Sequence, residues 1–179
     1  MTRVNSAEQL LEHYNQGERN FEGSNLDGAN LSGLVLKEIN LSRANLRKAD
    51  LTGTDLNKAI LFQADLSTAI LNRVELSQAN LTGANLSRSL ITGGILKKAI
   101  LLKASLNGAI LIGANLTQAR LRQADLSDAN LSSADLSEAV ITEAKFTQAK
   151  YSVSTNFPIG FDPVIAGMQI QETDGRSHS

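Results

Sequence analysis

Apolar residues recur at every fifth position along most of the chain. From Phe21 to Tyr151 this spacing gives 27 positions without a slip, and 22 of them are Leu. The residue two before the repeated Leu is usually Ala, and the residue between them is usually Asn or Asp. Ser, Thr, Gly, Gln, Lys and Arg fill most of the other two positions of each unit.

A period of five fits neither of the regular elements. On an α-helix five residues advance about 500°, so the Leu side chains would spread around the whole surface. On a continuous strand, residues five apart point to opposite faces. Ala and Leu, two apart, do share a strand face, so the chain is expected to extend for about three residues, turn a corner and repeat. Because no unit can bury its Leu alone, the units are expected to coil and stack as a solenoid.

Other repeat architectures have different spacings. A hexapeptide left-handed β-helix needs a period of six, and leucine-rich repeats mix spacings of two and three within 20–29 residues. A disordered low-complexity segment would not keep 27 apolar positions in register. The pattern therefore favours an all-β solenoid built from units of five.

The tandem order of Ala, then Asn or Asp, then Leu resembles the pentapeptide-repeat family. Residues 44–58 and 124–136 carry typical examples, and the resemblance extends over residues 19–153. It implies a right-handed quadrilateral β-helix with four units in each coil, hence nearly seven coils. A strand spacing of about 4.8 Å would make the rod roughly 32 Å long. Bulging is expected at Leu34 and Ile39, which replace the usual Ala; the sequence gives no reason for these residues or for Val74.

The segment before the repeat, residues 1–18, is expected to cover one end of the solenoid. Ser6 and Gln9 form a capping box and Gly17 can end a helix, so the sequence predicts a helix over about residues 7–15. This helix would lay three apolar side chains over the first coil, namely Leu10, Leu11 and Tyr14.

The far end is expected to have a different kind of cover. The period breaks at residues 154–170, which we interpret as a C-terminal cap with a short helix that starts near Pro163. Residues 171–179 are predicted to form a flexible tail. The expected plug consists of four apolar side chains, Phe157, Phe161, Ile165 and Met168.

Composition and charge narrow the classes of function. The formal net charge is −1, which excludes a strongly basic nucleic-acid binder, so no direct nucleic-acid binding is expected. The absence of Cys excludes disulfides, Cys-ligated zinc and thiol nucleophiles. No apolar run approaches the roughly 18 residues of a membrane span, and the N-terminus lacks an apolar signal segment. A cytoplasmic protein that does not enter a membrane is the expectation.

Residues capable of catalysis do not converge in the sequence. The two histidines, His13 and His178, lie in the predicted cap helix and tail and are interpreted as surface residues. Most carboxylates of the repeat occupy the Asn/Asp position, where we expect them to form hydrogen bonds at corners. We therefore expect no enzyme activity, no catalytic, metal or cofactor site, and no cofactor. The carboxylates concerned are Asp50, Asp55, Asp65, Asp125 and Asp135.

Two groups of outward residues are candidates for protein interaction. When the repeat is folded in twenties, Ile70, Leu90 and Ile110 replace Asn or Asp in three successive coils, and Ile112 extends them. A contiguous apolar strip of this kind is typical of an interaction surface, although such residues can also serve strand packing alone. A second, mildly basic patch contains Ile60, Phe62, Ile100, Leu102, Arg120 and Arg122.

These features favour a non-enzymatic scaffold that binds a protein partner through one flat face of the β-helix. The partner is not identified, and a second copy of the chain in a homodimer is left open. The family resemblance implies two alternatives: a DNA mimic that inhibits DNA gyrase and protects against fluoroquinolones, and a regulator of bacterial differentiation that contacts a transcription factor. Mimicry requires rows of carboxylates, whereas Lys or Arg interrupts the acidic residues on each face.

Overall fold

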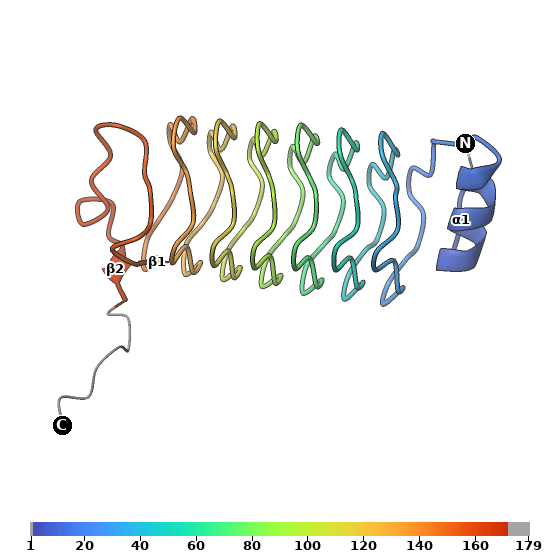
Figure 1. The fold of residues 1–179 in the computed structure, drawn as a ribbon, viewed down its shortest axis with the longest axis horizontal. Helices are drawn as coiled ribbons and strands as arrows, with labels where there is room; N and C mark the ends of the chain where they lie inside the picture. The colour runs from blue at the N-terminus through green and yellow to red at the C-terminus, as the bar shows by residue number, and fades with distance from the viewer. Residues whose placement is uncertain (1, 172–179) are drawn as a thin grey trace, which may run out of the picture.

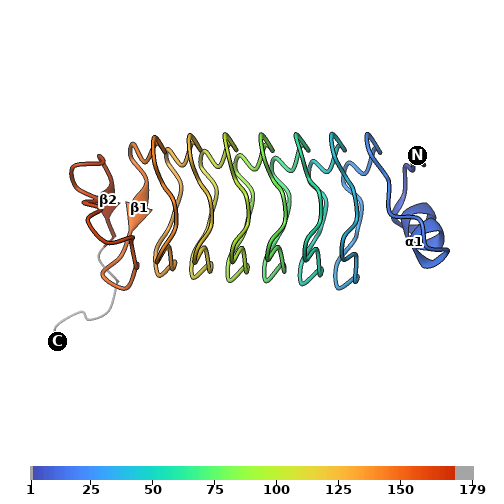
Figure 2. The same cartoon turned by 90° about the horizontal axis from the view of Figure 1, so that it is seen from above.

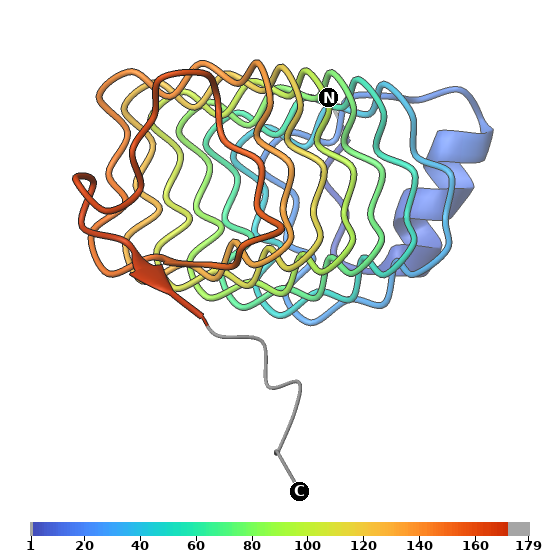
Figure 3. The same ribbon diagram turned by 60° about the vertical axis from the view of Figure 1, so that its left-hand side comes forward.

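The computed structural model describes residues 2–171, which form a rod of stacked coils, a right-handed quadrilateral β-helix (Figure 1). Parallel bridges between coils join residues twenty positions apart, as in Asn20 with Asn40 and Ile70 with Leu90. Each coil therefore contains four units of five, and its four sides are visible in the oblique view (Figure 3). The predicted solenoid and its four-sided coils are confirmed.

The interior consists of stacked columns of Leu and Ala side chains. Every repeated apolar residue from Phe21 to Leu136 is at most 1% exposed. Thr54 and Ser89 occupy Ala positions, and each hydroxyl donates to a carbonyl oxygen, that of Leu31 at 2.8 Å and that of Leu86 at 2.7 Å. Because both buried hydroxyls are satisfied, the two polar residues fit the core without an unpaired group.

Each unit turns its corner through left-handed backbone. The residue two after the repeated apolar residue has a positive φ in all 26 units from Gly23 to Gln148, and 18 of these residues are not glycine. The turn closes when the N–H of the next inner residue donates to the carbonyl of the Leu, as Ala44 does to Leu41 at 3.1 Å. A positive φ at the third residue is characteristic of type II turns, so the fold imposes this conformation even on side chains that disfavour it.

The irregular inner positions have a steric explanation in part. The closing hydrogen bonds of the turns measure 3.3 Å at Leu34, 3.4 Å at Ile39 and 3.2 Å at Val74, against 2.9–3.1 Å at every Ala. The expected bulging is thus a slight stretch of the corner. A Cβ at Gly94, one coil beyond Val74, would lie 2.8 Å from Ile91 Cγ2 and 3.4 Å from Val74 Cγ1. Gly94 therefore leaves room for these two β-branched side chains.

Helix α1 (Ala7–Asn15) covers the N-terminal end, as predicted (Figure 1). Ser6 is its N-cap and accepts a hydrogen bond from Gln9 N at 3.3 Å, while Gln9 Oε1 accepts one from Asn5 N at 3.1 Å. The two side chains therefore satisfy backbone donors at the start of the helix reciprocally.

Only one face of α1 reaches the core. Leu10 is fully buried, and Tyr14 packs against the core and donates through its hydroxyl to Lys37 O at 3.0 Å. Leu11 is half-buried and does not join the core, so the expectation that it covers the first coil was wrong. Leu11 lies at the edge of this face, about 100° around the helix from the fully buried Leu10.

The C-terminal cap is an irregular loop that ends in a short strand pair. Strand β1 (Lys150–Tyr151) pairs in parallel with β2 (Gln169–Ile170), and Figure 2 shows this pair at the end of the rod away from α1. Phe157 and Phe161 pack against the core, and Met168 is buried. The last bridge joins Asp135 to Asn156, one residue more than the usual spacing, which marks where the cap departs from the repeat.

Two expectations for this cap were wrong. Ile165 is 85% exposed rather than part of the plug, and turns rather than a helix follow Pro163. Asp162 Oδ1 accepts hydrogen bonds from Val164 N and Ile165 N, but Gly167 takes a positive φ and ends the turn after about one revolution. The first residue of the predicted tail, Gln171, donates through its N–H to Tyr151 O at 2.6 Å; the rest of that tail, His178 included, lies outside the described residues.

Candidate protein-interaction face

The outward Asn or Asp of each repeat unit makes a recurring hydrogen bond to the backbone. Its side-chain oxygen accepts a hydrogen bond from the backbone N–H two residues later, as in Asn115 to Thr117 at 3.0 Å. The expectation that the carboxylates form corner hydrogen bonds is confirmed. All five make this contact, at 2.9–3.1 Å: Asp50, Asp55, Asp65, Asp125 and Asp135.

The same kind of contact lowers the pKa of Asp50 and of Asp125. Hydrogen bonds from the hydroxyl and the N–H of Thr52 hold the pKa of Asp50 below its usual range. Partial burial raises the pKa of Asp125, but hydrogen bonds from Ser127 and the charge of Lys145 outweigh it, so this pKa also lies below the ordinary value. A general acid at neutral pH needs a raised pKa, so the shifts fit a structural role.

The structure brings the aliphatic residues of the first candidate group together. Parallel bridges join Ile70 to Leu90 and Leu90 to Ile110, so these residues occupy the same outward position in successive coils. All three are half-buried by their neighbours, and Ile112, two residues beyond Ile110, is 37% exposed. We call Ile70, Leu90, Ile110 and Ile112 the strip.

The strip forgoes the hydrogen bonds that Asn or Asp makes elsewhere. Within residues 2–171, neither Asn72 N nor Ile112 N has an acceptor, because Ile70 and Ile110 offer none. Thr92 N is the exception and donates to Asn72 Oδ1 from the preceding coil at 3.1 Å. Each missing bond is worth about 0.5–1.5 kcal/mol, a loss that the partial burial of the aliphatic side chains has to offset.

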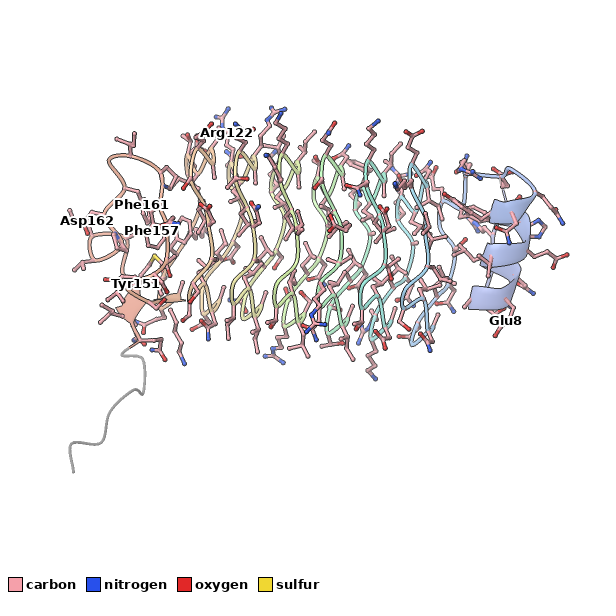
Figure 4. The ribbon with its side chains drawn as sticks, in the orientation of Figure 1. Glu8, Arg122, Tyr151, Phe157, Phe161 and Asp162 are labelled. Atoms are coloured by element: carbon pink, nitrogen blue, oxygen red, sulfur yellow. The ribbon has the colours of Figure 1, made fainter. Side chains whose placement is uncertain are left out.

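The second patch is less continuous. Bridges join Ile60 to Asn80 and Asn80 to Ile100, so a polar residue separates the two isoleucines. Arg120 is exposed and follows Ile100 in the next coil. Arg122 points outward near the C-terminal end of the rod (Figure 4) and forms an ion pair with Glu143 at 3.0 Å.

Charges around the two groups differ in kind. Ion pairs accompany the second patch, since Arg43, whose guanidinium lies 5.9 Å from the ring of Phe62, also pairs with Glu22 at 3.1 Å. Exposed pairs of this kind contribute little stability. The face that carries the strip has few charged residues, namely Asp50, Arg73 and Lys150. The strip is therefore the more apolar and the less charged of the two groups.

Within the described part of the chain, no group of three His, Cys, Asp or Glu side chains is placed to hold a metal ion. His13 lies half-buried in α1. In the same residues, no helix has the length and apolar character needed to span a bilayer.

Sequence reasoning missed a third apolar region at the C-terminal end. Pro158–Phe161 and Ala139–Thr142 line a groove of about 330 Å³. Side chains of the cap are strongly exposed there, above all Ile159. The break in the period at residue 154 was the available signal, but it did not show which cap residues would face outward.

A sequence model of the family described as "Pentapeptide repeats (8 copies)" matches the chain over residues 24–61, 59–97, 96–128 and 114–150. These stretches include most of the coils and both candidate groups. No curated protein matches the sequence significantly.

Solved structures with the same architecture include two with good superposition. HetL, a pentapeptide repeat protein involved in heterocyst differentiation regulation from the cyanobacterium Nostoc sp. strain PCC 7120, is 26% identical over 92% of both chains, with a TM-score of 0.64. A trypsin-treated form of QnrB1, a plasmid-mediated fluoroquinolone resistance protein, is 16% identical over 85% of this chain and 91% of its own, with a TM-score of 0.60. The second likeness concerns the fold alone.

Proposed function

Because the chain belongs to the pentapeptide-repeat family, we propose that it is a non-enzymatic scaffold and that it binds a protein partner through the face carrying the strip. The observation that carries this proposal is the column of three aliphatic residues at positions where Asn or Asp would form a hydrogen bond. A partner that covers the column would gain apolar burial there.

The chemistry of the face suggests the kind of surface that would fit it. The strip is flat and has few charges nearby, so its complement is an apolar, nearly neutral surface rather than a strongly acidic or basic one. A second copy of this chain satisfies that description as well as a different protein does. The oligomeric state is therefore the first quantity to measure, over a range of protein concentrations.

The decisive experiment replaces the strip with the ordinary residue of the repeat. The triple variant Ile70→Asn, Leu90→Asn and Ile110→Asn should keep the fold, because Asn is an ordinary occupant of this position and would offer an acceptor to the unpaired Asn72 N and Ile112 N. We expect it to lose dimerisation, or capture of the partner from a lysate of the native cell, by about tenfold or more. Unchanged association in both measurements would refute the proposal.

A matched control comes from another face. Ile95 is a lone aliphatic residue at the same position of the repeat, bridged to Glu75 on one side and Asn115 on the other. The variant Ile95→Asn should leave association unchanged. Equal losses in Ile95→Asn and in the triple variant would point to altered coil stability instead of a lost interface.

A regulatory role is the second candidate, and the likeness to HetL favours it, since the two chains superpose over 92% of their lengths. In that case the captured partner would be a transcription regulator. DNA mimicry remains a prediction that a gyrase supercoiling assay can test, and the mixed charges of each face argue against it.

A further inference from the structure

The backbone hydrogen bonds between coils follow one rule from Phe21 to Leu131. On the side that contains Leu121, the repeated residue and the residue two later donate to the next coil, as Leu121 N does to Val140 O (2.8 Å) and Gln123 N to Thr142 O (3.1 Å). In return, the inner Ala accepts from the next coil, as Ala119 O does from Val140 N (2.9 Å). Each side of a coil therefore offers two N–H donors and one carbonyl acceptor to the coil that follows it.

The last coil offers the same three groups without a partner. Among residues 2–171, no acceptor lies within hydrogen-bonding distance of Ile141 N or Glu143 N, and nothing donates to Ala139 O. The backbone of the cap pairs on either side of this edge. Before it, Leu136 N donates to Asn156 O at 2.7 Å; after it, Gln148 N donates to Gly167 O at 2.9 Å and Gln169 N donates to Ala149 O at 2.7 Å. The edge Ala139–Glu143 is thus an open edge of the ladder.

Side chains beside this edge are also incompletely covered. Ile141 is only half-buried, whereas every preceding residue of its column is buried. The groove of about 330 Å³ lies between the edge and Pro158–Phe161, and Ile159 on its far wall is fully exposed. Figure 4 shows Phe157 and Phe161 inside the cap, where they lie over the interior of the rod.

We propose that the edge Ala139–Glu143 binds an extended peptide as an additional parallel strand. The register of the rod defines the sequence that fits. A small residue must stack on Ala139 and a large aliphatic residue on Ile141, because Ala and Leu occupy these columns in the coils before. The preferred ligand is therefore a peptide with Ala, any residue, then Leu, and its outward middle residue would lie on Val140, which is 48% exposed.

The peptide backbone completes the ladder in this arrangement. The N–H of the middle residue donates to Ala139 O, and its C=O accepts from Ile141 N. The carbonyl two residues later accepts from Glu143 N. The surface is separate from the strip, so the proposal goes beyond the scaffold function and does not depend on it.

The chain's own repeat supplies the probe. The labelled peptide KAILLK, the sequence of residues 98–103, carries Ala and Leu at the required spacing. Fluorescence anisotropy with the full chain should detect binding below about 1 mM peptide. The isomer KLIALK exchanges the two inward residues at constant composition and should bind at least about tenfold more weakly. Failure of KAILLK to bind, or equal binding of both peptides, would overturn the proposal.

Backbone methylation provides a control that does not alter the protein. N-methylation of the Ile amide of KAILLK removes the donor to Ala139 O and should abolish binding. N-methylation of the last Lys amide should have no effect, because the equivalent N–H in each coil points away from the preceding coil. Peptide binding should also slow amide exchange at Ile141 and Glu143. Equal affinity of the two methylated peptides, or protection confined to other amides, would contradict this arrangement.

Variants of the groove wall locate the site independently. Ile159→Asp should weaken peptide binding, whereas Ile165→Asp should not, because Ile165 is exposed but does not line the groove. Equal affinity in both variants would place the peptide elsewhere and refute the site.

Discussion

The two ends of the rod are closed to different degrees. At the N-terminus, Leu10 of α1 covers the core, and the preceding segment pairs with the first coil, where Thr2 N donates to Asn20 O at 3.1 Å and Asn25 N donates to Val4 O at 3.0 Å. At the C-terminus, the cap covers the core with aromatic side chains but leaves the corresponding edge unpaired. A cap can therefore bury the apolar side chains at the end of the rod without forming hydrogen bonds with the exposed backbone of the last coil.

The contacts within the two caps differ in the same way. The C-terminal cap relies on tilted aromatic pairs, with ring centroids 5.1 Å apart for Phe146 and Phe161 and 5.0 Å apart for Phe157 and Phe161. Such pairs tolerate a range of geometries. The N-terminal cap relies on directed hydrogen bonds: the bond from Gln9 N to Ser6 Oγ starts α1, and the bond from the Tyr14 hydroxyl to Lys37 O joins α1 to the coil beneath it. We therefore expect the N-terminal cap to be the more sensitive of the two to substitution.

The largest effect is expected from the buried residue of each cap. Leu10→Ala should lower the free energy of unfolding by about 2–5 kcal/mol, because Leu10 is fully enclosed and its removal leaves a cavity. Met168→Ala should cost less, since Met168 lies at the more open end, where neighbours can close the space. Chemical unfolding of both variants tests this order, and an equal or larger loss in Met168→Ala would contradict the comparison.

A smaller effect compares the middle of the rod with the open end. Gly94→Ala should cost about 1–3 kcal/mol, because the new Cβ would press on Ile91 Cγ2. The equivalent pair at the open end is Ile141 and Ala144, which are three residues apart like Ile91 and Gly94. Both residues of this pair are half-buried. Adding Ile91→Leu to Gly94→Ala should recover most of the stability in thermal unfolding. No recovery would place the obstacle at the Ile91 carbonyl oxygen, 3.2 Å from the new Cβ, or at Val74 Cγ1, 3.4 Å from it.

Residues with a repeating environment could be predicted from the sequence, and the others could not. The period of five specified the coils and the column formed by Ile70, Leu90 and Ile110, because each residue meets its own equivalent twenty positions away. The capping box located α1 within a residue. The cap after Tyr151 has no such partner, so apolar character alone did not separate buried Met168 from exposed Ile165.

The open edge Ala139–Glu143 could not be predicted from the sequence, for a related reason. Whether Ile141 N finds an acceptor depends on the path of a non-repeating loop, and no residue type records that path. The pairing of Ile91 with Gly94 was visible as two departures from the repeat, but their steric connection needed coordinates.

A helix cap and a turn cap provide the next comparison. Ser6→Ala should cost about 1 kcal/mol, because it removes the acceptor for Gln9 N at the start of α1. Asp162→Ala should cost less, since Asp162 Oδ1 caps a turn whose residues Val164 and Ile165 are exposed. Urea unfolding of both variants compares the two losses of unfolding free energy. A larger loss in Asp162→Ala would mean that the C-terminal cap depends more on its hydrogen bonds than the N-terminal cap does.

The smallest effect concerns the pH response of the junction between α1 and the first coil. Glu18 links α1 to the first coil, where its carboxylate accepts hydrogen bonds from Asn20 N at 2.7 Å and Arg19 N at 2.9 Å. The Asn20 N–H in particular holds the pKa of Glu18 below its ordinary value. The unfolded chain therefore takes up this proton at a higher pH than the folded chain does. The stabilisation is complete above the unfolded pKa of about 4.3 and is lost as the pH falls through the lower, folded value.

Amide chemical shifts can follow this loss residue by residue. The amides of Arg19 and Asn20 should titrate together below about pH 4.3, whereas the amide of Gln169, which donates to a backbone carbonyl, should not follow them. In Glu18→Gln the side-chain oxygen can still accept both bonds, but it has no proton to gain, so the titration should disappear while the fold remains. A titration that persists in Glu18→Gln would assign the pH response to another carboxylate. The packing of Leu10 would then hold α1 on the first coil more than the Glu18 carboxylate does. The contrast between a hydrogen-bonded N-terminal end and an aromatic C-terminal end would weaken.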